Sequence, residues 1–157
     1  MAQELYHPQR GITSQDLTFL FRPDQPELAQ AVPVMLDLTY FTAATHYPDG
    51  VIKPGTLVAQ LDSGGDSGNW GAYVHDSSAG TGLDTADGMV YSGGIVKRDE
   101  ATGDPIFTDV QAAVLPKELA IQIVVANLPG LLDEALADYA PDAADLPSGF
   151  LDMSAYA

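Results

Sequence analysis

Two short segments of the chain carry residue types that could perform nucleophilic catalysis. Residues 65–68 (Gly-Asp-Ser-Gly) place Ser67 in a glycine-rich turn, and residues 42–46 (Thr-Ala-Ala-Thr-His) end on His46. A serine becomes a nucleophile when a histidine accepts its proton and a carboxylate orients that histidine. Ser67 and His46, together with a carboxylate, would therefore suit a small hydrolase.

The spacing of these residues argues against a protease. Residues 65–68 resemble the nucleophile segment of chymotrypsin-like enzymes, in which the histidine and the serine lie on two separate barrels. Here only about twenty residues separate His46 from Ser67, and the whole chain has 157 residues, whereas two such barrels need roughly 200 or more. Glycine, aspartate and serine are also common loop formers. We therefore predict a hairpin loop over residues 64–71 and no catalytic residue, with the hydrolase as an alternative.

The same loop could hold a cation. Asp62, Asp66 and Asn69 are spaced somewhat like the oxygen ligands of a calcium-binding loop. The EF-hand pattern fails because the twelfth position counted from Asp62 is Tyr73, where a bidentate glutamate is needed. The aspartates within residues 84–87 give a weaker version of this pattern. We favour a solvated glycine loop and predict no metal, with a calcium-dependent binding module as another alternative.

The histidines and glycines form none of the other familiar ligand patterns. His7, His46 and His75 are widely separated, so no two of them are spaced like a metal-binding pair. We expect each to be a surface or turn histidine. No glycine loop ends in Lys-Ser or Lys-Thr, and no Gly-x-Gly-x-x-Gly opens a helix after a strand. We therefore predict no cofactor.

The composition indicates a single acidic domain with tails. With 46% hydrophobic residues the chain can form one core, but it has no room for a second full domain. Its 22 acidic and 6 basic residues give a net charge of −16. This charge opposes binding to nucleic acid and to anionic membranes, because both need cations that replace counterions. We expect neither partner, and halophilic adaptation would give a similar acidity.

Cysteine content and hydropathy exclude further classes of protein. The chain has no cysteine, so disulfides and thiolate chemistry are excluded. It has no apolar run of about 18 residues, and residues 1–4 do not begin a secretory signal. We expect a soluble, unprocessed protein that is stabilised by packing or by association.

Turn residues between short apolar segments predict a mainly β fold with minor α. A turn with proline at its second position and glycine at its fourth occupies residues 47–50, and a second turn follows at residues 53–55. Segments rich in β-branched and aromatic residues recur every 10 to 16 residues between such turns. We predict a small antiparallel β-barrel or sandwich-like domain with strands over residues 32–41, 56–61, 70–74, 89–96 and 107–115.

We place this β-rich domain at residues 31–127. The segments before and after it differ from it in composition. Residues 1–30 contain three prolines and predict an extended N-terminal arm. Its apolar residues 17–21 would form either an edge strand of the core or a strand offered to a partner by β-augmentation.

The end of the chain is acidic, and we predict a helical segment and tail over residues 128–157. Residues 116–118 resemble a helix start, and residues 119–125 fit either a helix or a strand. The apolar spacing within residues 128–139 predicts a short amphipathic helix. Residues 141–157 predict a poorly ordered or partner-dependent tail.

Four segments, taken in order, resemble the lambda-type head decoration proteins of tailed bacteriophages. They are residues 53–59 (Lys-Pro-Gly-Thr-Leu-Val-Ala), 71–74 (Gly-Ala-Tyr-Val), 86–91 (Ala-Asp-Gly-Met-Val-Tyr) and 110–115 (Val-Gln-Ala-Ala-Val-Leu). In that family a Pro-Gly turn leads into a strand, and an Ala-x-Val strand closes the fold. The resemblance covers about 60 of the 157 residues and includes no catalytic signature. The acidic segment after residue 127 departs from the family pattern.

The resemblance implies a capsid cement protein, not an enzyme. Such a protein would sit on the outer surface of the virion, assembled in the host bacterial cytoplasm, as a homotrimer over threefold positions of the major capsid protein. The family's N-terminal arm orders on the shell, which assigns that contact to Leu17, Thr18, Phe19, Leu20 and Phe21. Trp70 and Tyr73 are candidates for subunit contacts, with a core position favoured for Trp70. A tail or head-fibre component is the alternative among virion proteins.

Overall fold

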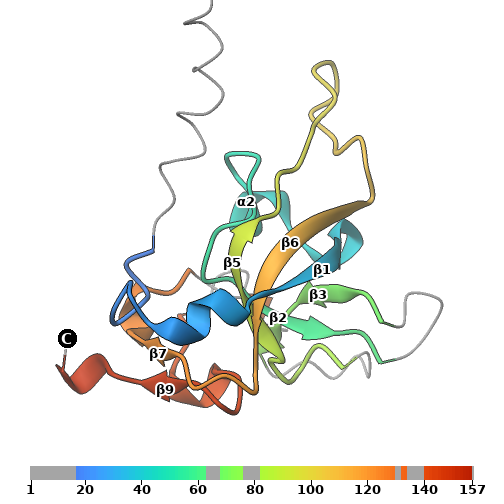
Figure 1. Cartoon of the computed structure of the whole chain (residues 1–157). Coiled ribbons are helices and arrows are strands. Elements are labelled where there is room, and N and C mark those ends of the chain that lie inside the picture. Colours follow the sequence, from blue (N-terminus) through green and yellow to red (C-terminus); the bar gives the residue numbers. More distant parts are fainter. Residues whose placement is uncertain (1–16, 63–67, 76–81, 130–131, 134–139, 157) are drawn as a thin grey trace, which may run out of the picture.

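The computed structural model describes residues 17–62, 68–75, 82–129, 132–133 and 140–156 (Figure 1). The strands are β1 (Val32–Asp37), β2 (Leu57–Gln60), β3 (Trp70–Ala72), β4 (Val74–His75), β5 (Gly88–Gly93), β6 (Asp109–Pro116), β7 (Gln122–Ile123), β8 (Leu132–Asp133) and β9 (Leu151–Asp152). The helical turns are η2 (Pro26–Gln30), η3 (Leu38–Tyr40), α2 (Ala43–His46), η4 (Val125–Asn127), η5 (Ala143–Asp145) and η6 (Ser154–Tyr156). None of the helices in these described ranges is long and apolar enough to cross a lipid bilayer.

Five strands close into a barrel in the order β1-β3-β2-β5-β6 (Figure 1). All neighbours are antiparallel except β1 and β3, which pair in parallel at Leu36 and Trp70 and so complete the ring. The predicted class, a mainly β barrel with little helix, is confirmed. Closure leaves these strands with few open edges, which matters for how the molecule can bind partners.

The first barrel strand is shorter than the sequence predicts. A strand is expected over residues 32–41, yet β1 ends at Asp37 and η3 follows. The Asp37 carboxylate accepts hydrogen bonds from the Thr39 backbone N–H (3.0 Å) and hydroxyl (2.7 Å). This local cap replaces ladder hydrogen bonds and turns the chain away from the sheet.

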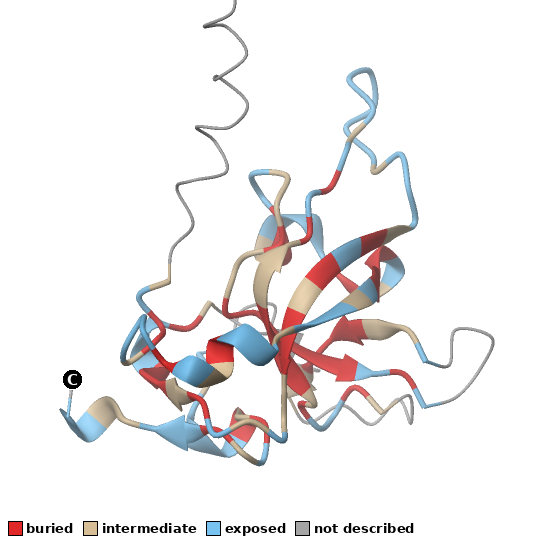
Figure 2. Ribbon diagram, viewed as in Figure 1, coloured by how far each residue is buried: buried red, intermediate tan, exposed pale blue. Residues whose placement is uncertain are grey.

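The barrel interior is filled by the alternate residues of its strands. In β6 the residues Val110, Ala112 and Val114 are buried in the interior cluster, as the period of two requires. Figure 2 shows buried and less buried positions alternating along this strand. The interior cluster also takes side chains from the loops that close the barrel ends. It consists of Leu36, Leu38, Phe41, Tyr47, Ile52, Val58, Ala72, Val90, Val96, Val110, Ala112 and Val114.

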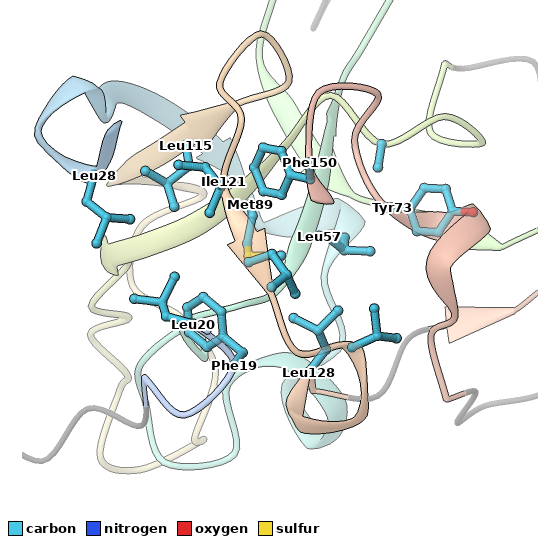
Figure 3. Close-up of a cluster of buried hydrophobic side chains, with 13 residues drawn as sticks. Phe19, Leu20, Leu28, Leu57, Tyr73, Met89, Leu115, Ile121, Leu128 and Phe150 are labelled. Atoms are coloured by element: carbon cyan, nitrogen blue, oxygen red, sulfur yellow. The ribbon is translucent and has the colours of Figure 1, made fainter. Parts of the chain in front are cut away.

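A second core lies on the outside of the barrel. Leu57, Met89 and Leu115 alternate with inward-facing residues, so they point away from the interior, yet all three are fully buried. The segments before β1 and after β6 cover them (Figures 1 and 3). The remaining buried members of this outer cluster are Phe19, Leu20, Leu28, Tyr73, Ala86, Ile121, Ile123, Val125, Leu128 and Phe150.

Strand β7 joins the two ends of the described chain. On one side Leu20 bridges Ile123, with the Phe21 N–H donating to the Gln122 carbonyl at 3.0 Å. On the other side β9 pairs in parallel with β7, and the Leu151 N–H donates to the Ile121 carbonyl at 2.8 Å. The covering layer is therefore a small hydrogen-bonded unit made from distant parts of the sequence.

Three predictions for the terminal segments are wrong where the structure describes them. Residues 17–30 are not an extended arm, because they pack on the outer cluster and include η2. Residues 116–118 do not begin a helix, since β6 runs to Pro116. Residues 141–156 are not a loose tail, because β9 pairs with β7 and Phe150 is buried.

The predicted amphipathic helix can be judged at two of its central positions. Leu132 and Asp133 form β8, which pairs in parallel with β4, so they are not helical. The remaining positions of that helix fall mostly outside the described residues, as do residues 1–16 of the predicted arm.

Candidate interaction surface

Part of the outside of the barrel stays open to solvent, where β1 and β6 run side by side. Pro33 pairs with Ala113 and Met35 pairs with Gln111. These four residues alternate with inward-facing neighbours and so point outward; we call them the outer β1–β6 face. Met35 is 43% exposed. An unbranched apolar side chain thus points outward from a strand that pairs with β6 along its whole length.

The outer β1–β6 face is free of charge in a strongly charged chain. Residues 32–36 of β1 and 110–116 of β6 contain no Asp, Glu, Lys or Arg, although 18% of the chain is charged. The β1–β6 ladder occupies the backbone groups that the two strands turn toward each other, and the face consists of side chains. A partner at this face would therefore meet side chains, not an open strand edge.

A second exposed apolar surface lies on the hairpin that projects between β5 and β6 (Figures 1 and 2). Ile95, Ile106 and Phe107 are 53%, 58% and 57% exposed; we call them the hairpin patch. The two arms pair through a bridge between Arg98 and Pro105. Large apolar side chains gathered on a projecting element are typical of a contact site.

The hairpin is firmly rooted in the barrel. The Arg98 guanidinium donates to the Tyr47 carbonyl at 2.6 Å and lies over the Tyr47 ring, 5.2 Å from its centre. The Val96 N–H donates to the Gly50 carbonyl at 2.8 Å, and the Val96 side chain is buried. These contacts hold the base of the hairpin, so the hairpin patch is presented in one orientation.

His46 is buried, which corrects the prediction of a surface or turn histidine. Its Nδ1 accepts a hydrogen bond from the Thr42 N–H at 2.8 Å, and its ring meets the Phe41 ring edge-on at 5.3 Å. Burial, assisted by the nearby Lys53 charge, lowers the pKa of His46 from 6.5 to about 4. A neutral imidazole with its Nδ1 engaged and its Nε2 buried is poorly placed to act as the base of a hydrolase. Ser67 lies outside the described residues.

The structure pairs a histidine and a carboxylate that the sequence does not connect. One oxygen of the buried Asp145 carboxylate lies 2.6 Å from the Tyr73 hydroxyl and 2.6 Å from the His75 Nδ1. The other oxygen accepts from the Asp142 N–H at 2.9 Å. Desolvation opposes ionisation of Asp145, but these hydrogen bonds outweigh it and lower its pKa. No sequence signal marks this cluster, because about 70 residues separate its members.

The loop considered above as a cation site borders an open hollow in the surface. Three aspartates, Asp62, Asp84 and Asp87, are among the residues that line this hollow. Asp87 already has partners, because it accepts from the Gln60 N–H at 2.9 Å and from the Lys117 ammonium at 3.1 Å. Within the described residues, no group of three His, Cys, Asp or Glu side chains is arranged to hold a metal ion. Asp66 falls outside those residues.

The predicted contact residues are mostly inside the molecule. Phe19 and Leu20 are 1% and 6% exposed, so the assignment of residues 17–21 to a shell-binding arm is wrong for these two, and the alternative of a core edge holds. Tyr73 is also buried, with its hydroxyl on Asp145, and is no surface contact. Trp70 is half-buried against the interior cluster, in keeping with the favoured core position.

Comparisons with protein-family models, with curated proteins and with solved structures gave no match for this chain.

Proposed function

We propose that this chain is a structural virion protein that decorates and stabilises an icosahedral bacteriophage capsid, binding the major capsid protein as homotrimers at threefold positions. In this proposal the activity is association, and the chain transforms no substrate. The two apolar surfaces, the outer β1–β6 face and the hairpin patch, carry the contacts with subunits and shell.

The observation that carries the proposal is where the family-like segments fall in the fold. Residues 53–59, 71–74, 86–91 and 110–115 supply parts of β2, β3, β5 and β6, four of the five barrel strands. The segments that carry the resemblance thus lie together in the barrel, which supports the proposal.

Two features of the surface support association as the activity. Apolar side chains on the hairpin patch are more than half exposed, which costs free energy unless a partner covers them. They stand on a projecting hairpin, which reaches beyond the barrel (Figure 1). We assign the hairpin patch to the shell because a rooted projection can enter a depression between capsid subunits.

The deciding experiment mixes the purified chain with expanded, undecorated heads of the tailed phage that carries it. We expect the chain to co-sediment with the heads at a fixed stoichiometry and to raise the temperature at which they release DNA. Heads that neither bind the chain nor gain stability would refute the proposal. Reconstruction of labelled particles would separate a decoration protein from a tail or head-fibre component by the position of the label.

A further inference from the structure

We infer that the outer β1–β6 face (Pro33, Met35, Gln111 and Ala113) is the centre of the contact between copies of this chain. The inference rests on the proposed function only in that both require association. It assigns that association to a particular surface and predicts its dependence on salt.

The charge of the chain limits where two copies can touch. Each copy carries a net charge of −16, so most approaches of two copies bring carboxylates together and are repulsive. The outer β1–β6 face lies within residues 32–36 and 110–116, which contain no charged residue, and Asp37 and Asp109 follow at its end. A partner of opposite charge would be recognised through the many carboxylates elsewhere. An uncharged face suits a partner that is as acidic as the chain itself, which is a second copy.

The same layer of side chains is already an interface within one molecule. Leu115 follows Ala113 on the outward side of β6 and is fully buried under the terminal segments. The terminal segments do not cover the next outward positions, where Gln111 of β6 and its partner Met35 of β1 are exposed. A second copy laid against Met35 and Ala113 would continue a buried layer that the chain itself begins.

The geometry favours a face contact with a polar rim. The contact lies on the face of the β1–β6 ladder, which pairs residues 32–37 with 109–114, so it joins side chains and does not extend the sheet. A standard interface uses roughly 20–30 residues on each side. The outer β1–β6 face is therefore its centre, with the paired residues Asp37 and Asp109 at one border and the buried Leu115 at the other.

The test measures self-association of the full chain by light scattering and sedimentation over a range of concentrations. We expect association to strengthen as salt rises, because salt screens the mutual repulsion of two acidic chains. The double variant Met35→Glu and Gln111→Glu should weaken association at least about 10-fold, since it places like charges opposite each other. The matched control Ala101→Glu and Ser148→Glu adds the same charge at exposed positions away from this face and should retain association close to the unmodified chain.

A second measurement does not depend on that variant. The chain has no cysteine, so a nitroxide on Gln111→Cys is a unique probe. It should lose mobility as association proceeds, whereas a nitroxide on Ala101→Cys should stay mobile. An unmodified chain that remains monomeric at every salt concentration, or a Gln111 label that stays mobile in the oligomer, overturns the inference. Failure to bind heads, by contrast, would refute the proposed function and leave this contact standing.

Discussion

At the scale of single residues, Asp145 fixes the end of the chain onto the barrel. Its carboxylate is buried and shared by Tyr73 and His75, two residues around β4. It also closes a capping box with Asp142 at the start of η5. The Asp145 carboxylate therefore accepts a hydrogen bond at the start of η5 and joins η5 to residues about 70 positions earlier in the chain.

Substitution of Asp145 should weaken the fold and change its acid stability. Asp145→Asn removes the charge that accepts both hydrogen bonds, and we expect a loss of about 2 kcal/mol in denaturant unfolding at neutral pH. The folded-state pKa lies below the ordinary 3.8, so this stabilisation is present above pH 3.8 and disappears as the pH falls through the lower folded value. Asp24→Asn, at an exposed carboxylate, is the control and should change stability much less. Equal losses in the two variants would contradict the role given to Asp145.

His46 gives a second pH window of the same sign. Its folded pKa of about 4 lies below the ordinary 6.5, so the unfolded chain binds its proton first as the solution is acidified. Stability is therefore complete above pH 6.5 and decreases between pH 6.5 and about 4. His46→Asn keeps an acceptor for the Thr42 N–H but cannot titrate. We expect thermal melts of this variant to lose the slope between pH 6.5 and 4, and an unchanged slope would show that another group causes it.

At the scale of elements, the segments before β1 and after β6 form the covering layer on the outward side of the barrel. We call this layer the lid. Strand β7 pairs with Leu20 on one edge and with β9 on the other. Gln25 strengthens this join, because its side chain donates to the Gln122 carbonyl at 3.0 Å and accepts from the Gln122 N–H at 2.7 Å. The lid is thus part of the domain core, and its removal would expose Leu57, Met89 and Leu115.

Phe19 should therefore behave as a core residue. Phe19→Ala is expected to cost about 3–5 kcal/mol in equilibrium unfolding, because it empties a fully buried site between the lid and the barrel. Phe21→Ala, at a half-exposed ring two residues away, is the matched control and should cost clearly less. If Phe19→Ala left stability unchanged, residues 17–21 would have to be regarded as an arm that can leave the barrel.

At the scale of the whole molecule, the surfaces divide into acidic and uncharged parts. The barrel presents the outer β1–β6 face on its side and the hairpin patch on a projection (Figure 1). A high negative charge keeps such chains apart at low concentration, and apolar surfaces of limited area then set where they join. Under the proposed function, the charge would keep the copies dispersed at low concentration until they reach a shell.

The hairpin patch can be tested separately from the contact between copies. The double variant Ile106→Ser and Phe107→Ser removes two exposed apolar side chains, so we expect stability within about 0.5 kcal/mol of the unmodified chain. Its mass in solution should not change, whereas its co-sedimentation with undecorated heads should fall at least about 10-fold. Ala101→Ser at the hairpin tip is the control. Unchanged head binding would place the shell contact on another surface.

The local sequence was sufficient for the class of fold and for most barrel strands. Alternation in residues 110–115 and the turn at residues 47–50 act over a few positions, where side-chain direction and backbone preference are decided by neighbours. The sequence by itself also determined the net charge of −16 and the absence of thiol chemistry. These properties depend on composition and not on which segments meet.

Only the tertiary structure decided the partners of segments that are distant in the chain. Leu20 could be an edge of the core or part of an arm until β7 provided its partner at Ile123. His46 reads as a turn histidine until the loops bury it, and Asp145 reads as one more acidic residue until η5 brings it to Tyr73. Burial and pairing across about 70 or more residues arise from packing of the whole chain, which no short pattern encodes.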